Sequence, residues 1–192
     1  MRIALLGGSF NPPHIGHVIL AEEILKTLDY DRVLFIPANI PPHKEPQGDP
    51  GTAMRLAMLR AALEGWPEFA IEQCELERAG ISFTIDTLRQ ISREYSFDGK
   101  PGLVIGDDLA RDFLKVWKDP ELILEYADII VAHREHVEEL SLPYAHRYVE
   151  NLIIPVSSTL VRERIATHGA WKSLVPPGVQ KMIEAYGLYR NI

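Results

Sequence analysis

The chain of 192 residues is predicted to fold as an α/β protein with a doubly wound parallel sheet, because two observations agree. Short apolar runs of strand length alternate along the chain with segments of helix length. These runs are also almost continuously apolar, as expected when helices cover both faces of a parallel sheet. The predicted strands are Ile3 to Leu6, Val33 to Ile36, Leu103 to Ile105, Ile129 to Ala132 and Leu152 to Ile154.

The segment between the first two predicted strands has the pattern of an amphipathic helix. Val18, Ala21, Leu25 and Leu28 recur at helical spacing and form one apolar stripe. With its two flanking strands this helix makes a βαβ unit, whose crossover is expected to be right-handed. Further helices are predicted at residues 52–64, 84–94, 108–115, 158–167 and 176–186.

Length and composition favour a single domain over residues 1–192. Apolar residues make up 46% of the chain and charged residues 24%, as in ordinary globular proteins. The net charge of −7 argues against nucleic acid as a partner, because binding a polyanion needs a basic face. The opening MRIALLGG is too short an apolar run for a signal peptide or membrane span, so we expect a cytoplasmic protein. No feature specifies an oligomeric state.

Two segments of this domain have a distinct composition. Residues 39–51 contain four prolines and two glycines, so we expect a loop with few internal backbone hydrogen bonds. Long loops in compact domains often carry function. From about residue 158 onward we expect a helical C-terminal part. The one cysteine, Cys74, is interpreted as an unpaired structural thiol.

The strongest functional pattern follows the first predicted strand. Residues 7–17 read Gly-Gly-Ser-Phe-Asn-Pro-Pro-His-Ile-Gly-His and lead into the first helix. Ligands of open α/β sheets bind at the carboxyl ends of strands, near the point where strand order reverses. Gly8 lets the backbone approach a ligand, and Ser9 and Phe10 offer backbone N–H groups to phosphate oxygens.

His14 and His17 are three residues apart, so they share one face of the first helical turn if the helix begins near His14. The unpaired N–H groups and the dipole of that turn already favour an anion. Two histidines there can donate hydrogen bonds to phosphoryl oxygens that gain charge during transfer. A lone histidine would be interpreted as structural, but this pair favours a phosphate site. A metal site is less favoured, because no third ligand is evident nearby.

A second anion site is predicted where a strand-like segment meets the helix at 158–167. Ser157 or Ser158 is a natural N-cap, and capping alone is the simplest interpretation of this segment. Yet Ser158, Thr159 and Arg162 are spaced to share one helical face and can surround one anion. Two phosphate cradles on one sheet suit a triphosphate.

The string His-Ile-Gly-His and its flanking residues resemble the signature of the nucleotidyltransferase superfamily, which implies a Rossmann-like sheet of the nucleotidyltransferase type. The chain has no Lys-Met-Ser-Lys-Ser loop, no P-loop and no Gly-x-Gly-x-x-Gly fingerprint. The two cradles together resemble those of bacterial nicotinate-mononucleotide adenylyltransferases. The resemblance extends over nearly the whole chain, and the other matching segments are Pro41 to Lys44, Ser82 to Leu88, Ile105 to Leu109 with Trp117, Leu174 to Val179, and Gly187 to Tyr189.

This resemblance implies an enzyme that transfers AMP from ATP to nicotinate mononucleotide, giving deamido-NAD and pyrophosphate. It implies catalytic roles for His14, His17, Lys44 and Arg162. The implied ATP-binding residues are Gly8, Ser9, Phe10, His14, His17, Gly106, Asp108, Ser158, Thr159 and Arg162, with Gly106 and Asp108 against ribose. The implied mononucleotide-binding residues are Asn39, Lys44, Thr84, Trp117 and Lys118.

Several residues keep a second interpretation beside the one implied by the family. Trp117 can stack on a pyridine ring or can simply belong to the core. Phe83 stands where the family has tyrosine, so a hydroxyl is missing there. We expect Mg²⁺ as cofactor, held mainly through ATP phosphates, with a possible contribution from Asp107. His43 is either a phosphate donor or part of the loop.

Other residues are interpreted as structural. The run Arg134 to Glu139 is expected to be a solvated helix face. Packing or surface roles are expected for Trp66, His133, His136, His146, His168, Trp171, Leu188 and Tyr189. Two alternative functions remain open: a related adenylyltransferase for nicotinamide mononucleotide or phosphopantetheine, and a sensor that binds ATP without turnover.

Overall fold

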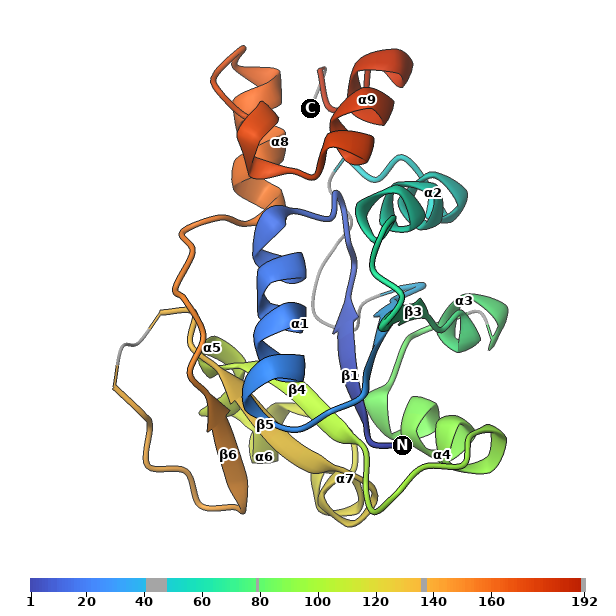
Figure 1. Cartoon of the computed structure of the whole chain (residues 1–192), viewed down its shortest axis with the longest axis vertical. Coiled ribbons are helices and arrows are strands. Elements are labelled where there is room, and N and C mark those ends of the chain that lie inside the picture. Colours follow the sequence, from blue (N-terminus) through green and yellow to red (C-terminus); the bar gives the residue numbers. More distant parts are fainter. Residues whose placement is uncertain (41–47, 79, 136–137, 191–192) are drawn as a thin grey trace.

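A computed structural model describes residues 1–40, 48–78, 80–135 and 138–190 of the chain. In this part the strands form one six-stranded sheet with the order β3-β2-β1-β4-β5-β6 (Figure 1). Every neighbouring pair is parallel, which confirms the predicted parallel sheet. The strands are β1 (Ile3–Gly8), β2 (Arg32–Pro37), β3 (Phe69–Ile71), β4 (Gly102–Gly106), β5 (Asp128–Ala132) and β6 (His146–Val149).

Helices cover both faces of the sheet, as a doubly wound fold requires. The strands place alternate side chains in two separate cores: Ala4 and Leu6 face one core, while Ile3 and Leu5 face the other. The helices are α1 (Ile15–Thr27), α2 (Thr52–Ala62), α3 (Cys74–Arg78), α4 (Thr84–Glu94), α5 (Asp107–Ala110), α6 (Phe113–Val116), α7 (Pro120–Tyr126), α8 (Ser158–Ala166), η1 (Lys172–Leu174) and α9 (Pro177–Tyr186). Among the described residues, no helix is both long enough and apolar enough to cross a bilayer.

Three expectations from the sequence are corrected by the structure. Residues 152–154 are not a strand: Leu152 is 67% exposed, and the last strand of the sheet is β6 instead. β6 lies at the sheet edge and is polar, so it lacks the apolar signature on which the prediction relied. The predicted helix 108–115 is two short helices, α5 and α6. The described part of the run 134–139 is not helical. In addition, β3, α3 and α7 have no local pattern from which they could be predicted.

The strand order creates a switch point between β1 and β4. The chain leaves β1 toward β2 on one side, and after β3 it returns to β4 on the other side of β1. Loops that follow these two central strands therefore diverge at their carboxyl ends and leave a crevice for a ligand. Residues 9–14 follow β1, and Asp107 follows β4. The fold thus brings the predicted histidine motif and the predicted ribose-binding residues to the same edge of the sheet.

The C-terminal helices extend the core beyond the sheet (Figure 1). α9 packs against α2, and Val179 and Ile183 of α9 are buried in the core on that side. The two helices approach closely at Gly178, where a Cβ atom would lie 2.7 Å from the carbonyl oxygen of Ala61. Such a contact with backbone cannot be relieved by rotating a side chain. The packing of the C-terminal part therefore depends on a residue without a side chain at this position.

We predict that Gly178→Ala destabilises the protein, because the added methyl group forces α9 away from α2. Overpacking of this kind costs roughly 1–3 kcal/mol, more than the helix propensity gained from alanine. Urea denaturation measures the change. Gly169→Ala is the matched control, because its Cβ would meet only ordinary contacts at 3.5 Å or more. Equal stability of Gly178→Ala and the wild type would contradict the prediction.

Candidate active site

The turn after β1 is shaped by one buried aromatic ring. Phe10 has a positive φ of 47°, unusual for a residue with a side chain. Its ring is buried, with its centroid 5.8 Å from that of Phe35 and 5.0 Å from that of His17. A Cβ on Gly8 would lie 3.1 Å from the Phe10 ring, so glycine makes room for it. The core thus fixes the path of the chain into the histidine motif.

His14 and His17 stack face to face at the start of α1. Their ring centroids are 3.7 Å apart, with 28° between the ring planes. His14 is the N-cap of the helix, and its backbone N–H donates to Nδ1 of His17 at 3.1 Å. In a neutral imidazole an accepting Nδ1 leaves the proton on Nε2, so Nε2 of His17 is a hydrogen-bond donor. The expected start of the helix near His14 is confirmed.

The surroundings of the two histidines favour their neutral forms. Burial lowers the pKa of His14 to about 3, and the positive charge of Arg134 adds to the effect. The pKa of His17 is also well below its ordinary value, first because of burial and then because of His14 and Arg134. Nδ1 of His14 is buried and has no hydrogen-bond partner among the described residues. A buried polar atom in this state is rare and fits a ligand-binding position.

The start of α8 is joined directly to the histidine loop. Ser158 Oγ donates to the carbonyl oxygen of Pro12 at 2.8 Å, and Arg162 Nη1 donates to that of Asn11 at 2.8 Å. Arg162 Nη2 also donates to Thr159 Oγ1 at 3.3 Å, so these two side chains share a face of the helix as predicted. Ser157, not Ser158, is the N-cap, with its hydroxyl accepting from Leu160 N–H. The two predicted cradles are therefore adjacent.

Tyr189 also holds this loop, a role the sequence did not predict. Its buried hydroxyl donates to Oδ1 of Asn11 at 2.7 Å and contacts Sδ of Met58. Burial raises the pKa of Tyr189, so the phenol keeps its proton and remains a donor. Packing was the expected role, and the residue is indeed packed in the core. The additional finding is the hydrogen bond from its hydroxyl to Asn11, which lies 178 positions earlier in the chain.

At the end of β4, Gly106 and Asp108 lie next to the side chain of Arg134. Arg134 Nη1 pairs with Asp108 Oδ2 at 2.9 Å, and a Cβ on Gly106 would collide with both partners. The other oxygen, Asp108 Oδ1, is buried without a hydrogen-bond partner among the described residues. Asp107 is buried, and its Oδ1 accepts the backbone N–H groups of Arg134 and Glu135 at 3.1 Å. Asp107 Oδ1 therefore stabilises the backbone after β5, and a contribution of Asp107 to a metal stays a prediction.

Arg134 lies beside the candidate site, although the sequence prediction does not include it. The sequence predicts a solvated helix face for the run that begins at Arg134. In the structure, Arg134 follows the end of β5 at the same edge of the sheet as the histidines. Its guanidinium is close enough to lower the pKa of both histidines. Position relative to a strand end, rather than residue type, would have identified it.

A second group of predicted residues gathers around the start of α4. Thr84 is the first residue of α4, with Phe83 as N-cap. Lys118 Nζ lies 4.4 Å from the centre of the Phe83 ring and 3.4 Å from Asp86 Oδ2. Trp117 is partly exposed and packs against Phe113, with ring centroids 5.3 Å apart. The Phe83 ring thus makes a cation–π contact with the Lys118 ammonium group, although it lacks the hydroxyl that the family's tyrosine has at this position.

Asn39 is tied to the segment that leads into α4. Its backbone N–H donates to Ser82 Oγ at 2.9 Å, and its side-chain amide donates to the carbonyl oxygen of Gly80 at 3.0 Å. The segments that carry Asn39, Thr84 and Lys118 therefore lie next to one another. Lys44 and His43, also predicted at the site, lie outside the described residues.

Arg55 connects the two groups and was not predicted as a site residue. Its side chain is 2% exposed and makes hydrogen bonds from all three nitrogens of the guanidinium. Nη1 donates to the carbonyl oxygens of Ser9 and Ala38 at 2.9 and 2.8 Å, and Nη2 donates to that of Asn39 at 3.2 Å. Nε pairs with Asp49 Oδ1 at 3.2 Å. One buried cation thus joins the loop after β1 to the loop after β2.

The family of this chain follows from comparison with known protein families. A family model described as cytidylyltransferase-like matches residues 5–164, which cover most of the sheet and both cradles. The chain therefore belongs to the cytidylyltransferase-like family.

Similar proteins show which group within this family the chain belongs to. A protein of Borreliella burgdorferi named "Probable nicotinate-nucleotide adenylyltransferase" is 42% identical over 189 residues, covering 98% of this chain and 97% of the relative. Proteins of the same name from Treponema pallidum and Geobacillus thermodenitrificans are 36% and 37% identical, covering 100% and 98% of this chain and 100% and 86% of the relatives. Within the family, the chain belongs to the nicotinate-nucleotide adenylyltransferases, and the resemblance seen in its motifs is confirmed.

A solved structure supports the fold. The nicotinic acid mononucleotide adenylyltransferase of Plasmodium falciparum complexed with NaAD superposes with a TM-score of 0.78 at 18% identity, covering 98% of this chain and 97% of that chain. The same enzyme complexed with APC gives a TM-score of 0.74 at 19% identity, with coverage of 98% and 96%. The Rossmann-like architecture expected from the sequence is therefore confirmed.

We predict that part of the stability of the free protein is lost as pH falls from about 6.5 toward 3. The unfolded chain takes up a proton on His14 near pH 6.5, whereas the folded chain resists it until about pH 3. Between pH 7 and pH 5 this one group accounts for about 2 kcal/mol of lost unfolding free energy.

Urea denaturation at the two pH values measures this loss in the wild type and in His14→Asn, which keeps an N-cap side chain. The variant should lose about 2 kcal/mol less than the wild type over this interval. His168 is exposed, so His168→Asn is the control: between pH 7 and pH 5 it should lose as much unfolding free energy as the wild type. An unchanged pH dependence in His14→Asn would contradict the assignment.

Proposed function

We propose that this chain transfers AMP from ATP to nicotinate mononucleotide, giving nicotinate adenine dinucleotide and pyrophosphate. The observation that carries the proposal is the stacked pair His14 and His17 at the carboxyl end of β1, joined through Pro12 to the start of α8. Nucleotides bind at this position in open α/β sheets. The names of the curated relatives add the acceptor. The cytoplasm is the proposed location.

The proposed reaction is a displacement at the α-phosphorus of ATP. An oxygen of the 5′-phosphate of nicotinate mononucleotide forms a bond to that phosphorus, the bond to the oxygen bridging to the β-phosphate breaks, and pyrophosphate leaves. Neutral His14 and His17 donate hydrogen bonds to phosphate oxygens as charge develops on them. A donor of this kind contributes roughly 2.7–4 kcal/mol to transition-state stabilisation. No covalent intermediate with the protein is required.

The start of α8 is the proposed site for the remainder of the triphosphate. Thr159 and Arg162 share one face there, and the free N–H groups of the first helical turn favour an anion. Ser158 faces Pro12 and steadies the junction between the two cradles. Gly8, Ser9 and Phe10 supply the backbone beside the phosphates. Positioning and charge neutralisation account for most of the catalysis in phosphoryl transfer.

Mg²⁺ is the proposed cofactor, held mainly through ATP phosphates, where it would neutralise their charge. Among the described residues, no cluster of three or more histidine, cysteine, aspartate or glutamate side chains can hold a metal ion. Binding through phosphates is the mode that Mg²⁺ commonly adopts with nucleotides. For ATP ribose we propose Gly106 and Asp108, because Asp108 Oδ1 is a buried acceptor in need of a donor.

The acceptor mononucleotide is proposed to bind around the start of α4. Thr84 begins this helix, where backbone N–H groups and the helix dipole suit the nicotinate carboxylate. Trp117, partly exposed, offers a face for the pyridine ring. Lys118, Asn39 and Lys44 are proposed to complete the acceptor side, with Lys44 neutralising phosphate charge.

A pyrophosphate-release assay with ATP and Mg²⁺ tests the proposed function. Nicotinate mononucleotide, nicotinamide mononucleotide and phosphopantetheine serve as acceptors at equal concentration. We expect kcat/KM to be highest for nicotinate mononucleotide, because only its carboxylate can bond to the start of α4 as an anion. Equal or better use of the nicotinamide form would overturn the substrate assignment. ATP binding without turnover of any acceptor would favour a sensor.

We predict that His17→Ala lowers kcat by at least about 100-fold, the scale observed when one transition-state donor is removed. Steady-state kinetics and urea denaturation are measured on the same preparation. The exposed His168→Ala serves as control and should retain full turnover. Near-normal turnover of a folded His17→Ala protein would remove this histidine from the mechanism.

A further inference from the structure

Glu75 is a buried carboxylate behind the acceptor side of the site. It lies in α3 and is only 8% exposed. Its Oε1 accepts a hydrogen bond from Thr87 Oγ1 at 2.6 Å, and the Ser82 hydroxyl lies near enough to the carboxylate to lower its pKa. A buried charge needs such partners, because burial alone would disfavour ionisation. Accordingly, burial raises the pKa of Glu75, while the bonds from Thr87 and Ser82 and the charge of Arg78 oppose the rise.

Ser82 passes this constraint on to the loop after β2. Its hydroxyl lies near the Glu75 carboxylate and accepts the backbone N–H of Asn39 at 2.9 Å. The backbone N–H of Ser82 donates to the carbonyl oxygen of Ile40 at 3.0 Å, next to the bridge between Ile40 and Ile81. Two segments distant in the chain are thus held side by side.

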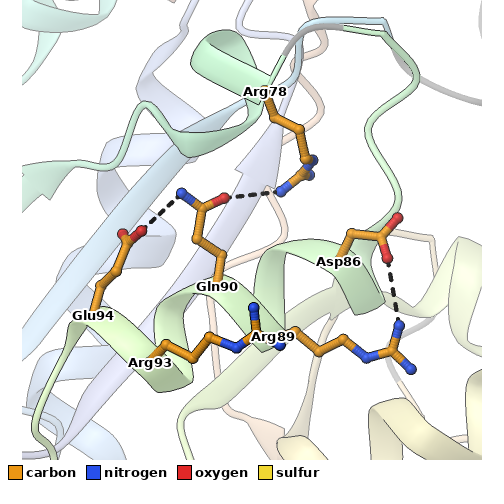
Figure 2. Close-up of a pocket in the computed structure, with 6 residues that line it drawn as sticks. All are labelled: Arg78, Asp86, Arg89, Gln90, Arg93 and Glu94. Atoms are coloured by element: carbon orange, nitrogen blue, oxygen red, sulfur yellow. Dashed lines mark hydrogen bonds and ion pairs between the residues drawn. The ribbon is translucent and has the colours of Figure 1, made fainter.

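Thr87 extends the same network into α4. Its hydroxyl donates to Glu75 and accepts from Arg78 Nη2 at 2.9 Å. Figure 2 shows Arg78 reaching toward Gln90 on the outer side of α4, where Nη1 donates to Gln90 Oε1 at 3.1 Å. These residues border a cavity of about 420 Å³ lined by Arg78, Asp86, Arg89, Gln90, Arg93 and Glu94. Arg78 thus separates the buried carboxylate from this open, polar cavity.

We propose that Glu75 is a positioning residue for the acceptor half of the site. Its carboxylate holds the hydroxyls of Ser82 and Thr87, which lie on either side of Thr84 in the chain. It thereby fixes the start of α4 relative to Asn39. This inference rests on the proposed function, in which Asn39 and Thr84 contact the mononucleotide. Glu75 itself does not touch the substrate in this scheme.

Steady-state kinetics of Glu75→Gln test the proposal. Glutamine keeps the shape but removes the negative charge and replaces one accepting oxygen by a donor, which weakens the contacts of this side chain with the hydroxyls of Thr87 and Ser82. We expect KM for nicotinate mononucleotide to rise roughly tenfold or more, because small displacements of binding groups have large effects. KM for ATP should stay within about twofold of the wild type, since the ATP side lies beyond this network.

Glu72→Gln is the matched control. Glu72 is 9% exposed, lies three residues from Glu75 and accepts bonds from Cys74 N–H and the Tyr95 hydroxyl. Among the described residues no hydrogen bond joins it to Ser82 or Asn39, so its loss should reduce stability without changing either KM. Ser82→Ala should reproduce the KM effect of Glu75→Gln, and the double variant should be no worse than either single variant. Thr87→Ser keeps the hydroxyl and should leave KM near that of the wild type.

Hydrogen exchange at the Asn39 amide gives a readout independent of turnover. Exchange should accelerate in Glu75→Gln and Ser82→Ala but not in Glu72→Gln. Unchanged exchange together with an unchanged acceptor KM would overturn the proposal, as would equal increases in KM for both substrates. Failure of the wild type to use nicotinate mononucleotide would instead count against the proposed function, while the exchange experiment would still decide the role of Glu75.

Discussion

The site depends on the buried guanidinium of Arg55. A charge in the core is costly unless its hydrogen-bonding capacity is filled, and here three backbone carbonyl oxygens and one carboxylate fill it. The cost makes the arrangement specific: the loops after β1 and β2 can supply these acceptors only in one relative position. In the proposed scheme Ser9 belongs to the ATP side and Asn39 to the acceptor side. A planar group with fixed donor directions therefore sets the spacing between the two substrates' sites.

Electrostatics within the site follow a consistent pattern. The histidines stay neutral because they are buried beside Arg134, so in the proposed role they would donate hydrogen bonds without adding charge of their own. Positive charge instead comes from Arg134 and Arg162, of which the first is balanced by Asp108 and the second bonds to uncharged groups. A polyanionic ligand would thus meet a site whose donors are already oriented. Preorganised donors of this kind need little rearrangement during the reaction.

Much of the fold was predictable because the central strands carry a strong apolar signal. β1, β2, β4 and β5 lie inside the sheet and were located to within one or two residues. The edge strands β3 and β6 are short or polar, so their formation depends on neighbours that a local pattern does not show. The same distinction holds for the site. His14, His17 and the group at 158–162 are contiguous motifs, whereas Arg55, Arg134, Tyr189 and Glu75 gain their roles only through contacts made after folding.

The bond from Tyr189 to Asn11 has a consequence for the order of folding. These residues lie 178 positions apart, so the bond closes almost the longest loop that the described chain permits. Contacts of such separation have a high entropic cost and usually form late. The β1–β2 unit can assemble early from local interactions, but the turn before His14 receives its final support only when α8 and α9 have docked. During synthesis the central strands are therefore available before the loop of His14 receives this support, and the proposed phosphate site would be completed last.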